Sequence, residues 1–143
     1  YLSSVMEYIN AYYTDKLSNI HIVFEVESYL DCLLRGDRDR LIEVVQNIME
    51  NALKYGDGKC ITITFSTEED CCLITIKNTG CTLKEDELPH LLDSFYRGSN
   101  VGNAKGSGLG LYRCRQLMHM MDGEIFAEIK ENEFFATVVI HKV

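Results

Sequence analysis

The chain has 143 residues, enough for one domain with a single hydrophobic core. Its 46% hydrophobic and 25% charged residues are typical of a globular protein. The net charge of −8 argues against non-specific nucleic-acid binding, which needs a basic surface. No apolar run approaches the roughly 20 residues of a membrane helix, and no signal peptide is visible. The chain lacks an initiator Met, so we interpret it as part of a longer protein.

Six cysteines are present, and none of them forms a CxxC pair. Zinc-binding spacing is therefore absent. Cys71 and Cys72 are adjacent and would point to opposite faces of a strand. We interpret the cysteines as reduced, half-buried thiols.

In chain order, helical spacing of apolar residues predicts a first helix over residues 1–13. Alternating apolar and polar residues predict a strand with one buried face over 20–27. The clearest helical pattern covers 36–56, where seven apolar residues recur on one side. Either Asp37 or Asp39 could cap the start of this helix.

The second half of the chain alternates hairpins with helical segments. Residues 59–80 predict a β-hairpin that turns at Glu68-Glu69-Asp70, and 82–96 predict two short helical turns. Residues 97–108 hold four glycines and almost nothing to bury, which is typical of a functional lid. A helix over 109–121 follows, and 125–141 predict a second hairpin.

Because the strands arrive largely in hairpins, the sheet should be mixed and mostly antiparallel, with the helices on one face. The sequence therefore predicts a two-layer α+β domain that spans residues 1–143.

The 36–56 helix has an unusual polar side. Glu43, Asn47, Asn51 and Lys54 fall within about 80° of one another at 100° per residue. An asparagine carbonyl oxygen suits a hard cation that also binds phosphate. Lys54 could neutralise phosphate, and Tyr55 could stack on a base. Alternatively, the two asparagines simply solvate this side of the helix.

The stretch GSGLGL (106–111) is ambiguous by itself. It is neither a Walker loop nor a dinucleotide fingerprint, because neither glycine spacing is present. Free N–H groups and the dipole of the helix that follows would still favour an anion there.

Taken together, these segments resemble the motifs of sensor histidine kinases. DRDRLIEVVQNIMENALKYG (37–56) resembles their asparagine box, and ITIKNTGCTLKEDELPHLLDSFYRG (74–98) resembles their first glycine box followed by the phenylalanine box. GSGLGLYRCRQLMHMMDGEI (106–125) resembles the second glycine box. Order and spacing agree from about Asp37 to Val139.

The resemblance implies the Bergerat-type ATP-binding fold, a sandwich of three main helices on a mixed sheet of about five strands. It implies ATP and Mg²⁺ as ligands, with Asn51 as the metal ligand. The catalytic residues that it implies are Asn51, Lys54, Arg97 and Lys105. The nucleotide-binding residues that it implies are Asn47, Asn51, Lys54, Tyr55, Asn78, Gly80, Thr82, Phe95, Gly106, Ser107, Gly108, Leu109, Gly110 and Leu111.

One departure from the family pattern lies in the first glycine box, which usually reads Asp-x-Gly-x-Gly. Here Asn78 replaces the Asp that accepts a hydrogen bond from the adenine amino group, and Thr82 replaces the last glycine. Asn78 can still accept this bond, but without charge assistance, so we expect weaker binding by roughly 1 kcal/mol.

A second departure is the missing phosphoacceptor. None of His21, His90, His119 and His141 lies in a phosphoacceptor motif. The resemblance thus implies a catalytic domain whose partner is the dimerisation domain of its own parent, with a response regulator as an indirect partner. We expect a monomeric fragment of a homodimeric, membrane-anchored sensor, located in the cytoplasm.

Two alternatives remain open. One is a non-catalytic ATP sensor, or pseudokinase, marked by Asn78. The other is an ATPase or an anti-sigma-factor serine kinase of the same superfamily, in which a Glu stands four residues before the asparagine of the box. Asn47 occupies that position here, so the sequence favours the histidine kinase.

Overall fold

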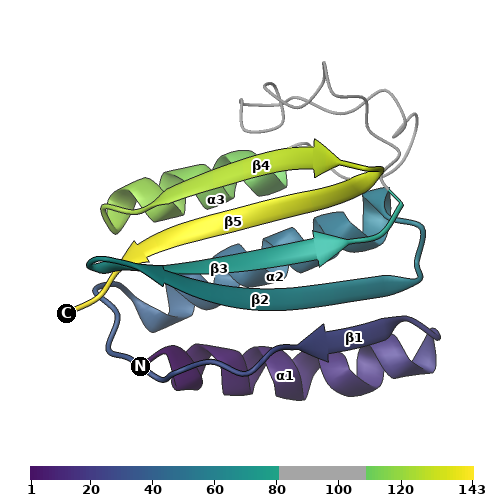
Figure 1. Cartoon of the computed structure of the whole chain (residues 1–143), viewed down its shortest axis with the longest axis horizontal. Coiled ribbons are helices and arrows are strands. Elements are labelled where there is room, and N and C mark those ends of the chain that lie inside the picture. The colour runs from purple at the N-terminus through teal and green to yellow at the C-terminus, as the bar shows by residue number, and fades with distance from the viewer. Residues whose placement is uncertain (81–108) are drawn as a thin grey trace.

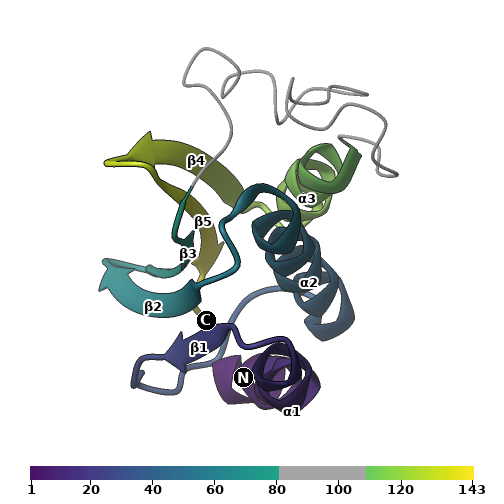
Figure 2. The same cartoon turned by 90° about the vertical axis from the view of Figure 1, so that its right-hand side faces the viewer.

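The computed structural model describes residues 1–80 and 109–143. Within them, three helices form one layer and a five-stranded sheet forms the other (Figures 1 and 2). The helices are α1 (Leu2–Asn19), α2 (Arg38–Tyr55) and α3 (Leu109–Met120). The strands are β1 (Val23–Val26), β2 (Cys60–Glu68), β3 (Cys71–Asn78), β4 (Glu124–Lys130) and β5 (Glu133–His141). The predicted two-layer α+β class is confirmed.

The sheet is mixed, with strand order β1-β2-β3-β5-β4. β1 runs parallel to β2, and the other neighbouring pairs are antiparallel. Both predicted hairpins form, and their turns contain residues with positive φ at Glu69, Glu131 and Asn132. Two hairpins therefore supply four of the five strands of this sheet, and β5 brings the second hairpin beside the first.

The core lies between the helices and the inner face of the sheet. β3 and β5 alternate buried with partly buried residues along their whole length, as strands covered on one face do. α1 extends to Asn19, beyond the predicted residue 13, because Tyr13 and Leu17 continue its buried side. Of the two predicted caps for α2, Asp37 is the one that forms: its side chain accepts from the backbone N–H groups of Asp39 and Arg40.

Two predicted segments lie outside the described residues. They are the helical turns over 82–96 and the glycine-rich loop over 97–108.

Candidate nucleotide-binding site

Several of the predicted site residues lie at one end of the sandwich. Asn51 and Lys54 are in the last turns of α2, Asn78 ends β3 and Leu109 begins α3. Figure 1 shows the ends of α2 and β3 on the right-hand side of the molecule and the start of α3 nearer its middle, and Figure 2 shows α2 and α3 side by side. The fold therefore brings together motifs that are far apart in the sequence.

Asn51 is partly buried, and its amide group is held by its own helix. Its side-chain Nδ2 donates to the backbone carbonyl of Asn47 at 2.9 Å. The amide nitrogen is thus committed to the helix, and Oδ1 is the atom of this side chain suited to accept a cation. A neutral oxygen ligand of this kind fits Mg²⁺, which prefers oxygen donors and retains several waters.

Asn47 lies where α2 meets α3. One turn before Asn47, the backbone carbonyl of Val44 accepts a hydrogen bond from the thiol of Cys114 in α3 at 3.5 Å. Burial raises the pKa of the Cys114 thiol to about 12, so this group remains neutral near pH 7. One turn from Asn47, Glu43 pairs with Arg113 of α3, with 3.1 Å between Oε2 and Nε. These contacts fix the start of α3 beside the asparagines.

Lys54 and Tyr55 are the last two residues of α2. The Lys54 side chain is exposed. Tyr55 is the last residue of the helix, and Gly56 follows it with its N–H bonded to the carbonyl of Ala52.

Asn78, the predicted adenine contact, is only 2% exposed. It pairs with Ile61 and Phe134 in the sheet register. A Cβ added to Gly56 would come within 2.7 Å of the Asn78 amide nitrogen, so these two residues are in close contact. Asn78 is therefore positioned jointly by the end of β3 and the residue that follows α2.

Two features of the structure require glycine at position 80. Its φ is +62°, a left-handed conformation, and an added Cβ would lie 2.5 Å from the Asp57 side chain. Asp57 is itself held firmly, because its Oδ1 accepts from the Thr79 hydroxyl at 2.7 Å and from Lys59 N at 3.0 Å. The turn after α2 is thus locked onto the end of β3.

Sequence reasoning missed Asp57. The hydrogen bond from Thr79, the largest cause, lowers the pKa of its carboxyl group. The signal in the sequence was an Asp between Gly56 and Gly58, directly after the asparagine helix. A loop Asp of this kind commonly bonds nearby backbone N–H groups, but its bond to Thr79 spans 22 residues and has no local signature.

The carboxylates of Glu43 and Glu50, which lie on α2 with Asn47 and Asn51, both bind other side chains. Glu50 accepts a hydrogen bond from the Tyr13 hydroxyl and pairs with Lys16, each at 3.2 Å, so it faces α1. Burial and Glu50 raise the pKa of Tyr13, which keeps its hydroxyl protonated as the donor. With Glu43 bound to Arg113, neither carboxylate is placed as a base beside Asn51.

The remaining predicted site residues are described in part or not at all. Leu111 is buried and belongs to the core. Leu109 and Gly110 form the first turn of α3. The predicted site residues outside the described ranges are Thr82, Phe95, Arg97, Lys105, Gly106, Ser107 and Gly108.

Two searches of the described residues were negative. Within 1–80 and 109–143, no three His, Cys, Asp or Glu side chains are grouped closely enough to hold a metal ion. In the same ranges, no helix has both the length and the apolar character of a transmembrane segment.

The sandwich, with its asparagine-bearing α2 against the sheet, has the architecture of the Bergerat class of ATP-binding domains. Residues 36–142 match the model of the family described as histidine kinase-, DNA gyrase B- and HSP90-like ATPases. The chain belongs to this family, as a catalytic ATP-binding domain of the sensor histidine kinase type.

Individual relatives agree with this assignment. The sensor histidine kinase RcsC of Escherichia coli K12 is 34% identical over 125 residues, which are 85% of this chain and 13% of RcsC. The sensor protein VanS of Enterococcus faecium is 35% identical over 105 residues, 71% of this chain and 27% of VanS. The chain thus spans a minor part of the length of these relatives.

Solved structures show the same fold. The nucleotide-free catalytic domain of histidine kinase ThkA has a TM-score of 0.84 at 24% identity, covering 99% of this chain and 94% of that domain. Full-length ShkA in complex with AMPPNP has a TM-score of 0.80 at 17% identity, covering 100% of this chain and 31% of ShkA.

Proposed function

We propose that this domain binds ATP with Mg²⁺ and transfers the γ-phosphoryl group to a histidine on a separate dimerisation domain. The observation that carries the proposal is the Asn51 side chain. Its nitrogen is bound by the helix, which leaves a carbonyl oxygen for a cation beside the exposed Lys54. The complex of ShkA with AMPPNP supports a nucleotide as the ligand of this fold.

In this proposal the residues have separate roles. Asn51 holds Mg²⁺, which supplies charge neutralisation for the phosphates when bound. Lys54 adds a positive charge, and Asn47 is the polar neighbour of the phosphates. Asn78 accepts from the adenine amino group, while Gly80 and Tyr55 border the base.

Most of the rest of the proposed site comes from residues outside the described ranges, and Leu109, Gly110 and Leu111 come from the start of α3. Arg97 and Lys105 are the proposed cations of a lid over the γ-phosphate, and Phe95 anchors that lid. Thr82 continues the adenine loop, and Gly106, Ser107, Gly108 and Gly110 pass beneath the triphosphate, flanked by Leu109 and Leu111. Catalysis would then consist of positioning and charge neutralisation.

The acceptor chemistry favours histidine over water or serine. A neutral imidazole is already basic near pH 7, so it needs no carboxylate base. Asn47 stands where an ATPase or serine kinase needs a glutamate, and Glu43 and Glu50 are bound to Arg113 and to Tyr13 with Lys16. These engagements count against the ATPase and serine kinase alternatives.

We propose that the acceptor domain belongs to the same parent protein and that a response regulator receives the phosphoryl group afterwards. The parent would be a homodimeric sensor with this domain in the cytoplasm, whereas the domain alone would be monomeric.

The test has two stages. Calorimetry with a non-hydrolysable ATP analogue, with and without Mg²⁺, should show Mg²⁺-dependent binding that Asn51→Ala removes. Asn19→Ala, at the exposed end of α1, is the matched control and should bind as the wild type does. Transfer is then measured by supplying the dimerisation domain separately and following phosphohistidine. Equal Mg²⁺ dependence in Asn51→Ala and the wild type would refute the metal role.

A second candidate is an ATP sensor that binds without transferring, which the replacement of the family Asp by Asn78 favours. The same experiment separates the two candidates. Analogue binding without phosphohistidine on the supplied domain supports the sensor, whereas transfer excludes it.

A further inference from the structure

A cysteine and a histidine meet on the outer face of the sheet, away from the nucleotide site. Cys71 begins β3, at the opposite end of that strand from Asn78, and His141 is the last residue of β5. The two residues are direct partners in the antiparallel register of these strands. Sγ of Cys71 lies 3.4 Å from Nδ1 of His141, and the two side chains form a hydrogen bond. The proposed function uses neither residue.

Backbone hydrogen bonds hold the chain on both sides of this pair. The carbonyl of His141 accepts from Arg35 N at 2.8 Å, and the carbonyl of Asp70 accepts from Lys142 N at 2.6 Å. The start of β3 and the end of β5 are thus joined to each other and to the β1–α2 connection. The thiol and the imidazole therefore stay within reach of one another in the folded domain.

The pair lines an open groove of about 800 Å³. Leu73, Val139 and Phe126 supply its apolar wall, and Phe126 is 58% exposed. Cys71 and His141 are both partly exposed. A small molecule can therefore reach the thiol from solvent and rest against an apolar surface.

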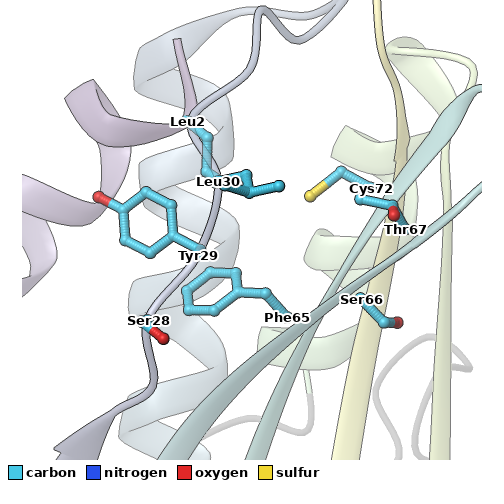
Figure 3. A pocket seen from close by; sticks show the side chains of 8 residues that line it. All are labelled: Leu2, Ser28, Tyr29, Leu30, Phe65, Ser66, Thr67 and Cys72. Carbon is cyan, nitrogen blue, oxygen red and sulfur yellow. The ribbon is translucent and has the colours of Figure 1, made fainter.

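Cys72, the next residue of β3, lies in a different environment. It is 1% exposed and lines a separate groove with Tyr29 and Phe65 (Figure 3), because successive residues of a strand point to opposite faces. Burial is the main cause that raises the pKa of the Cys72 thiol to about 11, so this thiol stays protonated near pH 7. Of these two adjacent cysteines, Cys71 is thus the accessible one.

Three carboxylates line the same groove as Cys71. They belong to Glu68, Glu69 and Asp70, the acidic turn between β2 and β3, and all three residues are exposed. In the part of the chain that the structure describes, none of them forms a salt bridge. Lys142, a nearby cation, does not line the groove. The groove therefore carries a negative charge that attracts cationic molecules.

We propose that Cys71 and His141 form a thiol-exchange site, at which Cys71 forms a mixed disulfide with small cationic disulfides of the aminothiol class. His141 accepts the proton of the thiol, and the acidic turn selects the positive charge. The site is independent of the proposed kinase function.

The reaction is balanced without a further oxidant. The thiolate is the nucleophile in disulfide exchange, and Nδ1 of a neutral imidazole protonated on Nε2 can accept the Sγ proton. Sγ of Cys71 then attacks one sulfur of the small disulfide, so that a new S–S bond forms and the old one breaks. The departing aminothiolate takes the proton from the imidazolium of His141. Sγ is oxidised, the departing sulfur is reduced, and the products are one mixed disulfide and one thiol.

The first experiment uses the wild-type chain and three disulfides of different charge: cystamine is positive, bis(2-hydroxyethyl) disulfide is neutral and dithiodipropionate is negative. Peptide mass spectrometry measures the rates at which Cys71 and Cys60 are modified in the same sample. Cys60 is the internal reference, because it is a partly exposed thiol that contacts the Thr62 hydroxyl, at 3.6 Å, and not a histidine. The ratio of the two rates cancels the intrinsic reactivity of each reagent.

We expect the Cys71-to-Cys60 ratio at low ionic strength to be at least about tenfold higher with cystamine than with dithiodipropionate, since charged clefts raise encounter rates by such factors. The neutral disulfide should give an intermediate ratio. About 1 M salt should reduce the difference, because it screens charges beyond about 3 Å. Equal ratios for the three reagents would overturn the proposed charge selection.

Neutralising the acidic turn tests the source of this selection. Glu68→Gln, Glu69→Gln and Asp70→Asn together should remove most of the preference for cystamine, while the rate with the neutral disulfide stays within about twofold of wild type. The matched control loses the same net charge at three exposed carboxylates of α1 and β1 and should keep the preference; its substitutions are Glu7→Gln, Asp15→Asn and Glu25→Gln. A preference that falls equally in both variants would assign it to net charge and overturn the role of the turn.

Replacing His141 tests the proton acceptor. With the neutral disulfide, His141→Gln and His141→Ala should each lower the rate at Cys71 at least about tenfold relative to Cys60, because a positioned base is lost. The control is His21→Asn, at an exposed histidine after α1 whose positive φ asparagine tolerates, and it should leave the ratio unchanged. Circular dichroism establishes that each variant is folded. An unchanged ratio in either folded His141 variant would refute the role of the imidazole.

Discussion

Gly80 and Gly58 offer a matched test of why glycine is needed beside the site. Both have positive φ, +62° and +73°, but a Cβ on Gly80 would strike Asp57 whereas one on Gly58 would meet nothing within 4 Å. We expect Gly58→Ala to lower the free energy of unfolding by about 1–2 kcal/mol from backbone strain alone. Gly80→Ala should cost about 2–5 kcal/mol, since overpacking adds to strain. Urea denaturation of both variants measures the difference.

A double-mutant cycle isolates the contact with Asp57. In the Gly80→Ala background, Asp57→Gly removes the clashing atoms, so the two substitutions together should cost less than the sum of their separate costs. Simple additivity would mean that the Asp57 contact does not determine the requirement for glycine.

Replacing Asn78 by Asp should change the affinity for an ATP analogue and the stability of the domain in opposite directions. Asn78→Asp restores a charged acceptor for adenine and should tighten ATP-analogue binding by about three- to tenfold. The side chain is 2% exposed, so a buried carboxylate should lower the unfolding temperature of the free domain. Calorimetry and thermal denaturation measure the two effects, and unchanged or weaker binding would argue against the adenine contact.

At the scale of elements, α1 is capped by a residue from another segment. The Asp31 side chain accepts from Ser3 N at 2.8 Å and from the Ser3 hydroxyl at 2.7 Å. These bonds, the backbone one first, lower the pKa of Asp31 in the folded domain. A lowered pKa stabilises the fold above the unfolded-state value, near 4, and this contribution is lost as the pH falls through the folded value.

We therefore expect Asp31→Asn to lower the unfolding temperature at neutral pH, with the difference from the wild type shrinking once the pH falls below about 4. Thermal denaturation over this pH range measures the effect. Asp15→Asn, on the exposed side of α1, is the control and should change the unfolding temperature little at any pH. A pH-independent effect of Asp31→Asn would indicate that the cap does not depend on charge.

The elements that sequence reasoning predicted well have strong local patterns. The apolar side of α2, the alternation in β3 and β5 and the turn signals of both hairpins all lie within a few residues of one another. What it missed depends on contacts across the fold. Asp31 reaches Ser3 over 28 residues, and Asp57 reaches Thr79 over 22. No local pattern reports such pairs.

At the scale of the whole molecule, α2 runs from the connection after β1 to the proposed nucleotide site. α2 begins where the connection from β1 ends, contacts α1 through Glu50 and α3 through Glu43, and ends at the proposed phosphate contacts. Its apolar side packs on the sheet, so its polar side remains for ligand and helix contacts. The asparagines are thus carried by a helix that contacts both other helices and the sheet.

This arrangement predicts that nucleotide binding stabilises the entire domain. A ligand that binds only the folded state at 100 times its Kd adds about 2.7 kcal/mol to the free energy of unfolding. For a domain of this size, that should raise the unfolding temperature by about 5–10 °C. With Mg²⁺ and an ATP analogue we expect the full rise in the wild type and in Asn19→Ala. Asn51→Ala at the same concentrations should rise only as far as the wild type does without Mg²⁺, because its cation ligand is gone. Thermal denaturation with each ligand alone and together measures this, and a full Mg²⁺-dependent rise in Asn51→Ala would place the cation elsewhere.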